Sequence, residues 1–205
     1  MIVKATHKLL ANDLVYDVFQ TCVGSYRFRK RFLSKLDVAP ESQIIELGCG
    51  TGITLETLKS NQYTGIDISS KYLEKAQNRN SSAKLLLGDV SISETFLNIS
   101  ANQNDLVLAL ALWHHIDDGQ MIKTLQNISD VSQVGTKIYS LDPFVDEQTS
   151  LSASWIARND RGKFLRSVEQ LKEVAEFSGF HLEFKVSRRE LYIPTNVIKC
   201  TFTKI

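Results

Sequence analysis

The stretch that decides the fold of this 205-residue chain reads Ile44-Ile45-Glu46-Leu47-Gly48-Cys49-Gly50-Thr51-Gly52. Its apolar first half predicts a buried strand. Its three glycines at alternate positions predict a sharp turn whose bare backbone can lie against a ligand. The alternative is an ordinary strand-to-helix turn, but one glycine would suffice for that. We therefore expect a strand, a ligand-binding loop and then a helix over residues 53–59.

Short apolar runs and helical stretches alternate on the C-terminal side of this stretch. The apolar runs lie near residues 43–47, 63–66, 83–87, 105–112 and 137–141. This alternation predicts βαβ units and a parallel sheet. Near the end of the chain, residues 182–186 and 198–202 alternate strictly between apolar and polar, which predicts an antiparallel pair. With two helices expected over 8–36, the fold class is α/β, a doubly wound and mostly parallel sheet of seven strands.

Composition excludes several classes of protein. The 24 Lys and Arg residues nearly balance the 23 Asp and Glu residues, so no global charge attracts nucleic acid or an anionic membrane. The longest apolar run, Leu106 to Trp113, is far too short to cross a bilayer. Three scattered cysteines without a CxxC pair argue against a disulfide framework and indicate a reducing compartment. We expect a cytoplasmic protein.

Two acidic residues end neighbouring strands of the predicted sheet. Asp67 closes the second strand, nineteen residues past Gly48, where a carboxylate can accept hydrogen bonds from both hydroxyls of a ribose. The alternative is that Asp67 caps the next helix, a role for which Ser69 competes. Asp89 closes the third strand and could accept a hydrogen bond from an adenine amino group. The alternative is that Asp89 stabilises a turn, as loop aspartates often do, and binds no ligand.

Two adjacent histidines follow the predicted fourth strand. His114 or His115 could act as a general base at the ligand-binding edge, because imidazole titrates near neutrality. The alternative is that they hydrogen-bond neighbouring backbone. A metal site built on His-His-x-Asp-Asp is disfavoured, because adjacent residues of an extended chain point to opposite faces. We expect no metal.

These residues together resemble the class I S-adenosylmethionine-dependent methyltransferases. The segment 46–52 looks like the family's glycine-rich first motif, Gly65-Ile66-Asp67 like its ribose-binding acid, and Gly88-Asp89-Val90 like its adenine-contacting segment. Leu112-Trp113-His114-His115-Ile116 looks like the segment after its fourth strand in small-molecule members. The resemblance implies a Rossmann-like fold and methyl transfer from S-adenosylmethionine to an oxygen or nitrogen atom of a small molecule.

The resemblance also implies a role for each matching position. Residues expected at the cofactor are Glu46, Gly48, Cys49, Gly50 and Gly52 around methionine and ribose, Asp67 on the ribose hydroxyls, Ile68, Asp89 and Val90 at adenine, Ala109 and Leu110 beside the sulfonium, and Tyr16 or Tyr26 closing over it. His114 is the expected base for an oxygen acceptor. An amine that is already deprotonated needs none.

One domain is expected, with its substrate-binding residues outside the cofactor-binding core. The expected parts are a helical cap (1–38), the core (39–142), a lid insertion (143–166), and a C-terminal helix and hairpin (167–205). The residues expected at the acceptor are Trp113, His115, Trp155, Arg158, Arg161 and Arg166. These arginines could clamp an anionic acceptor through bidentate hydrogen bonds. The alternative is that they are solvated or paired at the surface.

Two other functions remain open. The first is a nicotinamide-dependent oxidoreductase. Its dinucleotide-binding motif GxGxxG requires a third glycine at position 53, where the chain has Ile53. A non-catalytic scaffold or regulatory protein would bind the cofactor without turnover. Nucleic acid is not expected as a partner, because residues 109–112 read Ala-Leu-Ala-Leu instead of the Asn/Asp-Pro-Pro-aromatic segment of base-amino methyltransferases.

Overall fold

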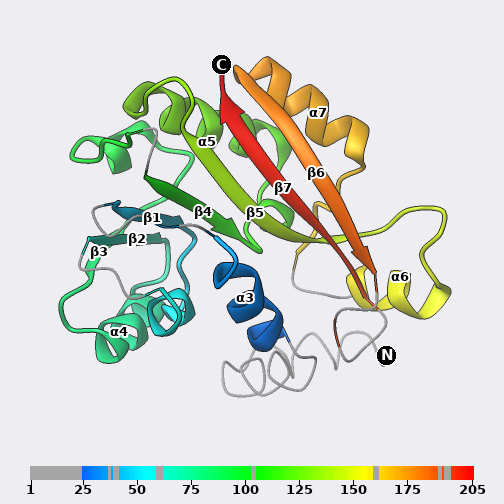
Figure 1. Ribbon diagram of the computed structural model, residues 1–205, viewed down its shortest axis with the longest axis horizontal. Coiled ribbons are helices and arrows are strands. Elements are labelled where there is room, and N and C mark those ends of the chain that lie inside the picture. The colour runs from blue at the N-terminus through cyan, green and yellow to red at the C-terminus, as the bar shows by residue number, and fades with distance from the viewer. Residues whose placement is uncertain are drawn as a thin grey trace.

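The computed structural model describes residues 25–36, 38, 42–58, 62–102, 105–158, 162–188, 191 and 195–205. Its centre is one sheet of seven strands in the order β3-β2-β1-β4-β5-β7-β6 (Figure 1). The five parallel strands are β1 (Ile44–Leu47), β2 (Tyr63–Asp67), β3 (Lys84–Leu87), β4 (Leu106–Leu110) and β5 (Lys137–Phe144). The antiparallel strands are β6 (Phe180–Arg188) and β7 (Asn196–Lys204). The predicted fold class is confirmed.

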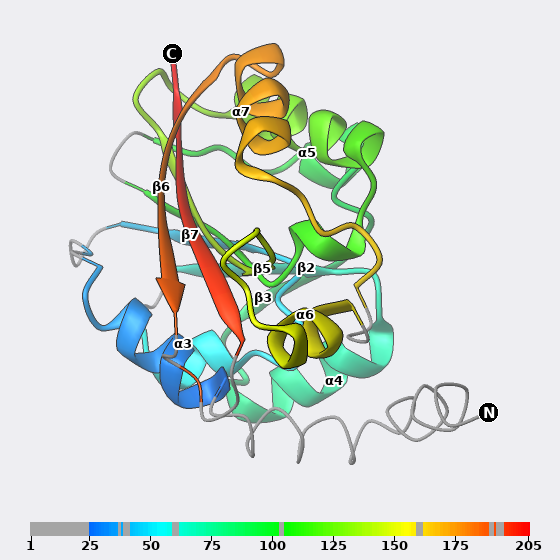
Figure 2. The ribbon, with the colours of Figure 1, turned by 90° about the vertical axis from the view of Figure 1, so that its right-hand side faces the viewer.

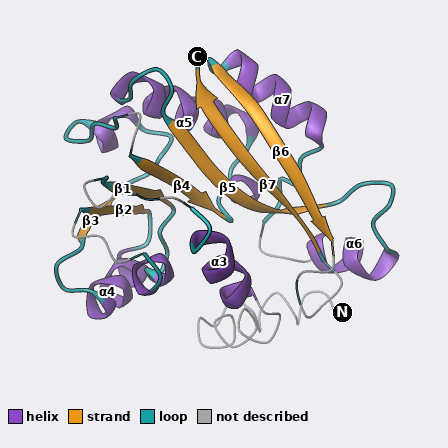
Figure 3. Cartoon of the chain, in the orientation of Figure 1, coloured by secondary structure: helices purple, strands orange, loops and turns teal. Residues whose placement is uncertain are grey.

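Helices cover both faces of this sheet. The α-helices of the described part are α3 (Ser25–Leu33), α4 (Ser70–Arg79), α5 (Asp118–Val131), α6 (Leu151–Arg158) and α7 (Val168–Phe177). Single 3-10 turns are η1 (Ile53–Glu56), η2 (Ser93–Phe96) and η3 (Trp113–His115). Figures 2 and 3 show α5 and α7 on one side of the sheet and α3 and α4 on the other. The first helix expected within 8–36 lies outside the described residues.

The central strand β4 shows how the sequence builds two cores. Leu106, Leu108 and Leu110 pack on one face with residues of α3 and α4. Val107 and Ala109 point to the other face, into the core that α5 and α7 complete. Successive strand residues alternate between faces, so a strand buried on both sides reads as a continuous apolar run.

The two best-defined helix starts have reciprocal caps. Ser167 accepts a hydrogen bond from the backbone of Gln170, whose side chain in turn accepts from the backbone of Ser167. Asp117 and Gln120 form the same arrangement at α5. The Ser-x-x-Gln spacing of residues 167–170 predicts this capping box, and each such cap satisfies two backbone N–H groups that would otherwise lack partners. Gly179 follows α7 with φ 78°, as predicted for a C′ glycine.

Two predicted helices are much shorter than expected. The helix expected over 53–59 is the single turn η1, closed by a hydrogen bond from Thr57 N–H to the Thr54 carbonyl. The spacing of Ser91 and Glu94 also predicts a capped helix, but the Ser91 hydroxyl donates to Asp89 Oδ1 and η2 has no side-chain cap. At Ser91 a local side-chain hydrogen bond thus competes with a regular helix.

The strand order places a ligand-binding edge between β1 and β4. The chain leaves β1 toward β2 and β3 on one side and returns to β4 on the other. The connections diverge at this switch point, which opens a crevice at the carboxyl ends of the strands. No helix of the described part is long and apolar enough to span a membrane.

Candidate functional site

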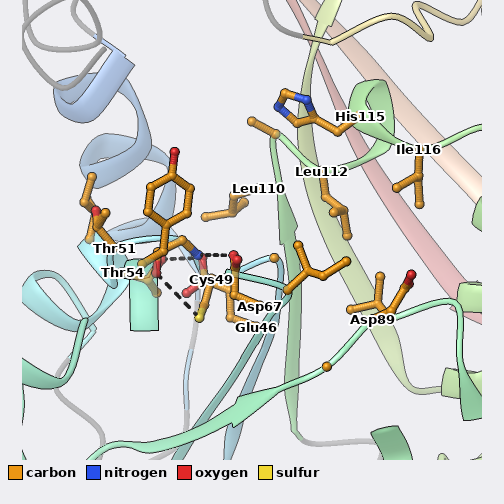
Figure 4. Close-up of a pocket in the computed structure, with 18 of the residues that line it drawn as sticks. Glu46, Cys49, Thr51, Thr54, Asp67, Asp89, Leu110, Leu112, His115 and Ile116 are labelled. Carbon is orange, nitrogen blue, oxygen red and sulfur yellow. Dashed lines mark hydrogen bonds between the residues drawn. The ribbon is translucent and has the colours of Figure 1, made fainter. Parts of the chain in front are cut away.

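A cavity of about 510 Å³ opens at the carboxyl ends of β1, β2 and β4. Figure 4 shows Glu46, Cys49 and Asp67 together on its floor, Asp89 to one side, and His115 at the opposite edge from the floor. The residues that line the cavity are Tyr26, Arg29, Glu46, Gly48, Cys49, Gly50, Thr51, Ile53, Thr54, Asp67, Ile68, Tyr72, Gly88, Asp89, Val90, Leu110, Ala111, Leu112, His115, Ile116 and Gln120. The structure therefore gathers most of the predicted cofactor residues in one place.

The glycine loop leaves backbone exposed to this cavity. Gly48 and Gly50 have φ values of 66° and 54°, a region that other residues rarely adopt. A Cβ on Gly50 would meet no atom within 4 Å, so any side chain there would extend into open cavity. A glycine is needed at position 52 for a different reason, because an added Cβ would lie only 2.8 Å from Ala76 Cβ of α4. The expectation that Gly52 touches the cofactor is corrected, because it provides room for helix packing and does not line the cavity.

Asp67 fastens the glycine loop to the end of β2. Its Oδ2 accepts a hydrogen bond from Gly50 N–H at 2.8 Å, and its Oδ1 accepts from Ser69 N–H at 2.9 Å. Ser69 is the residue that caps α4, since its hydroxyl accepts from Tyr72 N–H. The capping alternative for Asp67 is therefore wrong, and its carboxylate lines the cavity beside the loop.

Asp89 and Ile68 lie at the side of the cavity formed by β2 and β3. Asp89 Oδ1 accepts hydrogen bonds from the N–H and the hydroxyl of Ser91, both at 2.8 Å. The turn expected as the alternative thus exists, and Asp89 still lines the cavity with Val90. Ile68 lines it too and leaves 72% of its surface exposed. An apolar ring with an amino edge would suit this combination of side chains.

Glu46 is a buried carboxyl on the cavity floor. It accepts hydrogen bonds from Thr54 Oγ1 at 2.7 Å and from the Tyr63 hydroxyl at 2.6 Å. Burial raises the pKa of Glu46 to about 7, although both hydrogen bonds and the positive charge of Arg29 favour the ionised form. Glu46 therefore changes its charge near neutral pH, next to the ligand space.

Replacing Glu46 by glutamine is expected to change how the stability of the ligand-free protein depends on pH. Because folding raises the pKa of Glu46 from 4.5 to about 7, the folded protein binds this proton more tightly than the unfolded chain. This group makes the free energy of unfolding fall by roughly 3 kcal/mol as the pH rises from about 4.5 to about 7. Urea unfolding at pH 5 and pH 8 should show that fall in the wild type and lose it in Glu46→Gln.

The matched control for this change is Glu56→Gln, which alters an exposed acid of the neighbouring turn η1. It should leave the pH profile close to that of the wild type. Parallel profiles for the wild type and Glu46→Gln would contradict a raised pKa at this position.

The two histidines have different surroundings. His114 is 3% exposed. Its ring Nδ1 lies 2.9 Å from Asp142 Oδ1, and its backbone N–H donates a hydrogen bond to the same oxygen. The expectation that His114 faces the cleft is wrong, since it does not line the cavity. His115 does line it, and its ring centroid lies 4.1 Å from that of His114. The buried pair Asp142–His114 thus packs behind the histidine that lines the cavity.

Trp113 and Ala109 were expected at the substrate and at the cofactor, but both lie in the core. Trp113 is 1% exposed, packs edge-on against Phe202 with ring centroids 5.9 Å apart and does not line the cavity, so it is a core residue. Ala109 is fully buried in the same core. The neighbouring Leu110 points to the opposite face of β4 and lines the cavity. Alternation along the strand decides which of the two residues can border the cofactor.

The segment 162–166, which we call the strap, packs on η3. Arg166 is 7% exposed; it bonds Asp118 at 2.6 Å, the Ile116 carbonyl at 2.7 Å and the Trp113 carbonyl. Phe164 N–H donates to the His114 carbonyl, and a Cβ on Gly162 would lie 1.9 Å from His114 Cδ2. The expectation that Arg166 clamps substrate is wrong, because its guanidinium is already bonded to the η3 segment.

The other described residues of 143–166 do not line the cavity either. Trp155 and Arg158 lie exposed on α6, where Arg158 Nε donates to Ser154 Oγ. The described residues of this segment include α6 and the strap, and none of them lines the cavity. Arg161, expected at the substrate, and Tyr16, expected over the cofactor, lie outside the described residues.

Sequence reasoning missed Arg29 and Thr54. Arg29 lies one helical turn after Tyr26, so α3 presents both side chains to the cavity. The i, i+3 spacing to an aromatic already named for the cofactor was a usable signal. Thr54 lies three residues after Thr51 and bonds Glu46, a contact between a turn and a strand that no local pattern predicts.

The donors and acceptors of the cavity fit S-adenosylmethionine. Asp67 and the bare Gly48–Gly50 backbone suit a ribose, and Ile68, Asp89 and Val90 suit an adenine. Glu46 and Arg29 supply opposite charges for an amino acid. Among the described residues, no three histidine, cysteine or acidic side chains are grouped so that they could hold a metal ion.

Comparison with known proteins agrees with this fit. A family model described as "Methyltransferase domain" matches residues 44–135. That range runs from β1 past the end of α5, so it contains the glycine loop, both strand-ending aspartates and the histidine pair. No curated protein sequence matches the chain.

Several solved methyltransferases share the fold. A methyltransferase from Thermotoga maritima, described as a "possible histamine N-methyltransferase", is 20% identical with a TM-score of 0.69, covering 97% of this chain and 99% of that one. The mitomycin 7-O-methyltransferase MmcR is 17% identical with a TM-score of 0.68 over 94% of this chain. Human N-acetylserotonin methyltransferase, solved with S-adenosylmethionine, is 17% identical with a TM-score of 0.63 over 86% of this chain.

This chain spans only 58% of the mitomycin enzyme and 51% of the human one. At these identities the likeness shows the fold, while the family match rests on the sequence of residues 44–135. The two findings together decide against a nicotinamide-dependent enzyme. Residues 44–135 thus match a methyltransferase domain, and the fold is the one that S-adenosylmethionine-dependent methyltransferases share, which agrees with S-adenosylmethionine as the cofactor.

Proposed function

We propose that this methyltransferase acts on an oxygen or nitrogen atom of a small-molecule acceptor. The observation that carries the proposal is the cavity, whose volume of about 510 Å³ lies in the range of small-molecule sites. Its lining is largely apolar, with a few polar groups that converge from β1, β2, β3 and η3. Such a lining suits a compact acceptor that is enclosed together with the cofactor.

The side chains divide the cavity into two regions. Glu46 lies in β1, Asp67 ends β2 and Asp89 follows β3, and the three would orient the cofactor. Leu112, His115, Ile116 and Gln120 follow β4 and would surround the acceptor. When bound, the cofactor supplies a methyl group already activated by its sulfonium. The protein then has to align the acceptor with that methyl group and exclude water.

His115 is the residue best placed to remove a proton from an acceptor hydroxyl. Its ring lines the cavity, whereas the ring of His114 is occupied by Asp142. General bases of this kind contribute about 10²–10⁴-fold to a rate. The buried His114 packs against the His115 ring and would hold it in position. The base role first expected of His114 thus passes to its neighbour.

The structural relatives support acceptors of this size. Two of them are named for an O-methyl transfer to mitomycin and for N-acetylserotonin, and the Thermotoga protein is described in connection with histamine. All three are small molecules, and both oxygen and nitrogen acceptors are represented.

The proposal predicts methyl transfer into the low-molecular-weight fraction of a cell extract. Wild-type protein with cofactor labelled in its methyl group should label a metabolite, and mass spectrometry of the product identifies the acceptor atom. His115→Asn should reduce the rate of an oxygen acceptor at least 100-fold while leaving cofactor affinity unchanged. A nitrogen acceptor that is already deprotonated should react at nearly the wild-type rate in this variant.

Two outcomes would overturn the proposal. Label found only in protein or nucleic acid would show a macromolecular acceptor. Tight cofactor binding without label in any fraction would favour the non-catalytic scaffold. The variant Asp67→Ala serves as the negative control for cofactor-dependent labelling.

A further inference from the structure

We propose that a second copy of this chain binds along the outer edge of β6, so that the seven-stranded sheets of two copies join into one. The two β6 strands run antiparallel in this assembly, about a twofold axis at Phe184. The inference concerns how the protein assembles, and it depends on neither the cofactor nor the acceptor.

The first support is the length and regularity of β6, which is an outer strand of the sheet (Figure 1). Within the described part of the chain, β6 pairs with β7 alone, and the pairing continues without a break over all 9 of its residues. The outer strand at the other end, β3, has only 4 residues. Proteins usually shorten, bend or cover an outer strand, because its backbone groups attract another strand. β6 is long and regular enough to pair with one.

The second support is the direction of the backbone groups in β6. Ile205 N–H donates to the Gly179 carbonyl, just before β6 begins. Lys204 N–H donates instead to the Thr136 carbonyl, on the β5 side of β7. Successive strand residues direct their backbone groups to opposite sides, so the odd-numbered residues of β6 bond to β7. The N–H and C=O groups of the even-numbered residues, with Phe184 in the middle, therefore point outward.

The third support is that the side chains of β6 complement themselves across this twofold axis. With the two Phe184 residues opposite each other, Glu183 of each copy faces Lys185 of the other, which gives two ion pairs on one face of the joined sheet. On the other face, Leu182 of each copy lies opposite Val186 of the other. Opposite charges and apolar side chains directly across two strands stabilise a sheet. A twofold interface requires this kind of self-complementarity.

The charges also select one register of pairing. The smallest shift that keeps the outward backbone groups facing the second strand is two residues, which gives two neighbouring registers. One of them places the two Glu183 residues opposite each other, and the other does the same with the two Lys185 residues. Like charges directly opposite each other destabilise a sheet, so the register centred on Phe184 is favoured over both.

The fourth support is the surroundings of Lys185 and Phe184 within one copy. The residue directly opposite Lys185 in β7 is Lys199, so two like charges face each other there. Glu183 of a second copy lies on the other side of Lys185 and offsets this repulsion. Phe184 is 42% exposed, with Lys172 Nζ 5.5 Å from the centre of its ring. A second strand also removes part of this apolar surface from water.

The twofold arrangement places the two α7 helices over different halves of the strand pair. Figures 1 and 2 both show α7 beside the first half of β6. Antiparallel pairing brings the first half of one strand next to the second half of the other. The helices of the two copies are therefore displaced from each other along the strands.

The test uses two variants that repel themselves and attract each other. Sedimentation velocity of the wild type over a series of concentrations should show an equilibrium between monomer and dimer. Lys185→Glu places acids opposite acids, and Glu183→Lys places cations opposite cations, so each variant alone should dimerise about 10-fold more weakly or worse. An equimolar mixture of the two variants should regain the wild-type affinity within about 3-fold, because every facing pair then has opposite charges.

Two further variants complete the design. The double variant Glu183→Lys/Lys185→Glu exchanges the two charges and should dimerise like the wild type. Lys123→Glu makes the same change of charge on an exposed position of α5 and should leave dimerisation unchanged. Thermal midpoints equal to that of the wild type show that the variants are folded.

Hydrogen exchange locates the contact. In the wild-type dimer the amide hydrogens of Leu182, Phe184 and Val186 should exchange slowly, and in monomeric Lys185→Glu they should exchange fast. The amide hydrogens of residues 183 and 185, which point toward β7, should stay slow in both proteins.

A wild-type protein that stays monomeric throughout the concentration series would overturn the proposal. Slow exchange of the Phe184 amide in such a monomer would show that another segment of the chain covers this edge, which also excludes a second copy there. A dimer that Lys185→Glu and Glu183→Lys each form as tightly as the wild type would use a different surface, and the proposal would be wrong.

Discussion

Asp67→Ala is expected to raise the dissociation constant for S-adenosylmethionine several hundred-fold. A ribose offers two hydroxyls to the Asp67 carboxylate, and each hydrogen bond to a charged group contributes roughly 1.5–3 kcal/mol. The same substitution removes the acceptor of Gly50 N–H, which lies 2.8 Å from Asp67 Oδ2. The glycine loop therefore loses one of its hydrogen bonds to β2 when the ligand loses its partner, and keeps the one from Cys49 N–H to the Ile66 carbonyl. Calorimetric titration with the cofactor measures the change.

The control for Asp67→Ala is Ser69→Ala, two residues further along the chain. Ser69 caps α4 but does not line the cavity, so its loss should cost about 1 kcal/mol of stability and leave cofactor affinity within a few-fold. An Asp67→Ala protein with wild-type affinity would contradict the site assignment. Equal losses of affinity in both variants would place the effect in α4 instead of the ribose contact.

Arg166→Met is expected to lower the free energy of unfolding by about 2–6 kcal/mol, because it leaves two carbonyls without their charged donor at roughly 1–3 kcal/mol each. The guanidinium is nearly buried and bonds Asp118 and the carbonyls of Trp113 and Ile116. Removal leaves two carbonyls of the η3 segment without these partners, since methionine offers no donor. Asp118 is exposed and can be hydrated after the substitution. The loss of stability therefore comes from the two buried carbonyls. Urea unfolding followed by circular dichroism measures it.

Arg158→Met is the matched control, because Arg158 is an exposed arginine whose guanidinium bonds only the nearby Ser154 in the described structure. It should change stability by less than about 0.5 kcal/mol. Unfolding free energies of Arg166→Met and Arg158→Met within 1 kcal/mol of each other would contradict the strap's role. The strap also packs on His114, which lies behind His115. The Arg166→Met protein should therefore bind the cofactor with normal affinity but transfer the methyl group more slowly.

The sequence allowed the sheet and much of the cavity to be predicted. Isoleucines 44 and 45 before the glycine loop and the apolar run around 106–110 predicted the central strands, because strands buried on both faces leave a continuous apolar signature. Asp67 and Asp89 could be placed because the carboxyl ends of parallel strands meet at one edge. The capping box at Ser167 followed from a local hydrogen-bonding pattern alone.

The single turns η1 and η2 could not be predicted in the same way. Each contains residues that are compatible with a helix, but a competing hydrogen bond decides the outcome. Ser91 binds Asp89 instead of capping a helix, and Thr54 directs its hydroxyl to Glu46. The choice depends on where an acceptor lies after folding, which periodicity does not contain.

What the sequence by itself determined is the order of the elements, the glycine loop and the two carboxylates that follow β2 and β3. These features depend on periodicity, on chain reversal at glycine and on the common edge of parallel strands. Only the tertiary structure decided which neighbouring side chains reach the ligand. His115 lines the cavity and His114 does not, Arg29 faces it, and Arg166 holds η3. The physical reason is that a side chain's direction relative to distant segments is set by packing, and adjacent residues with the same chemistry cannot be told apart before the chain is folded.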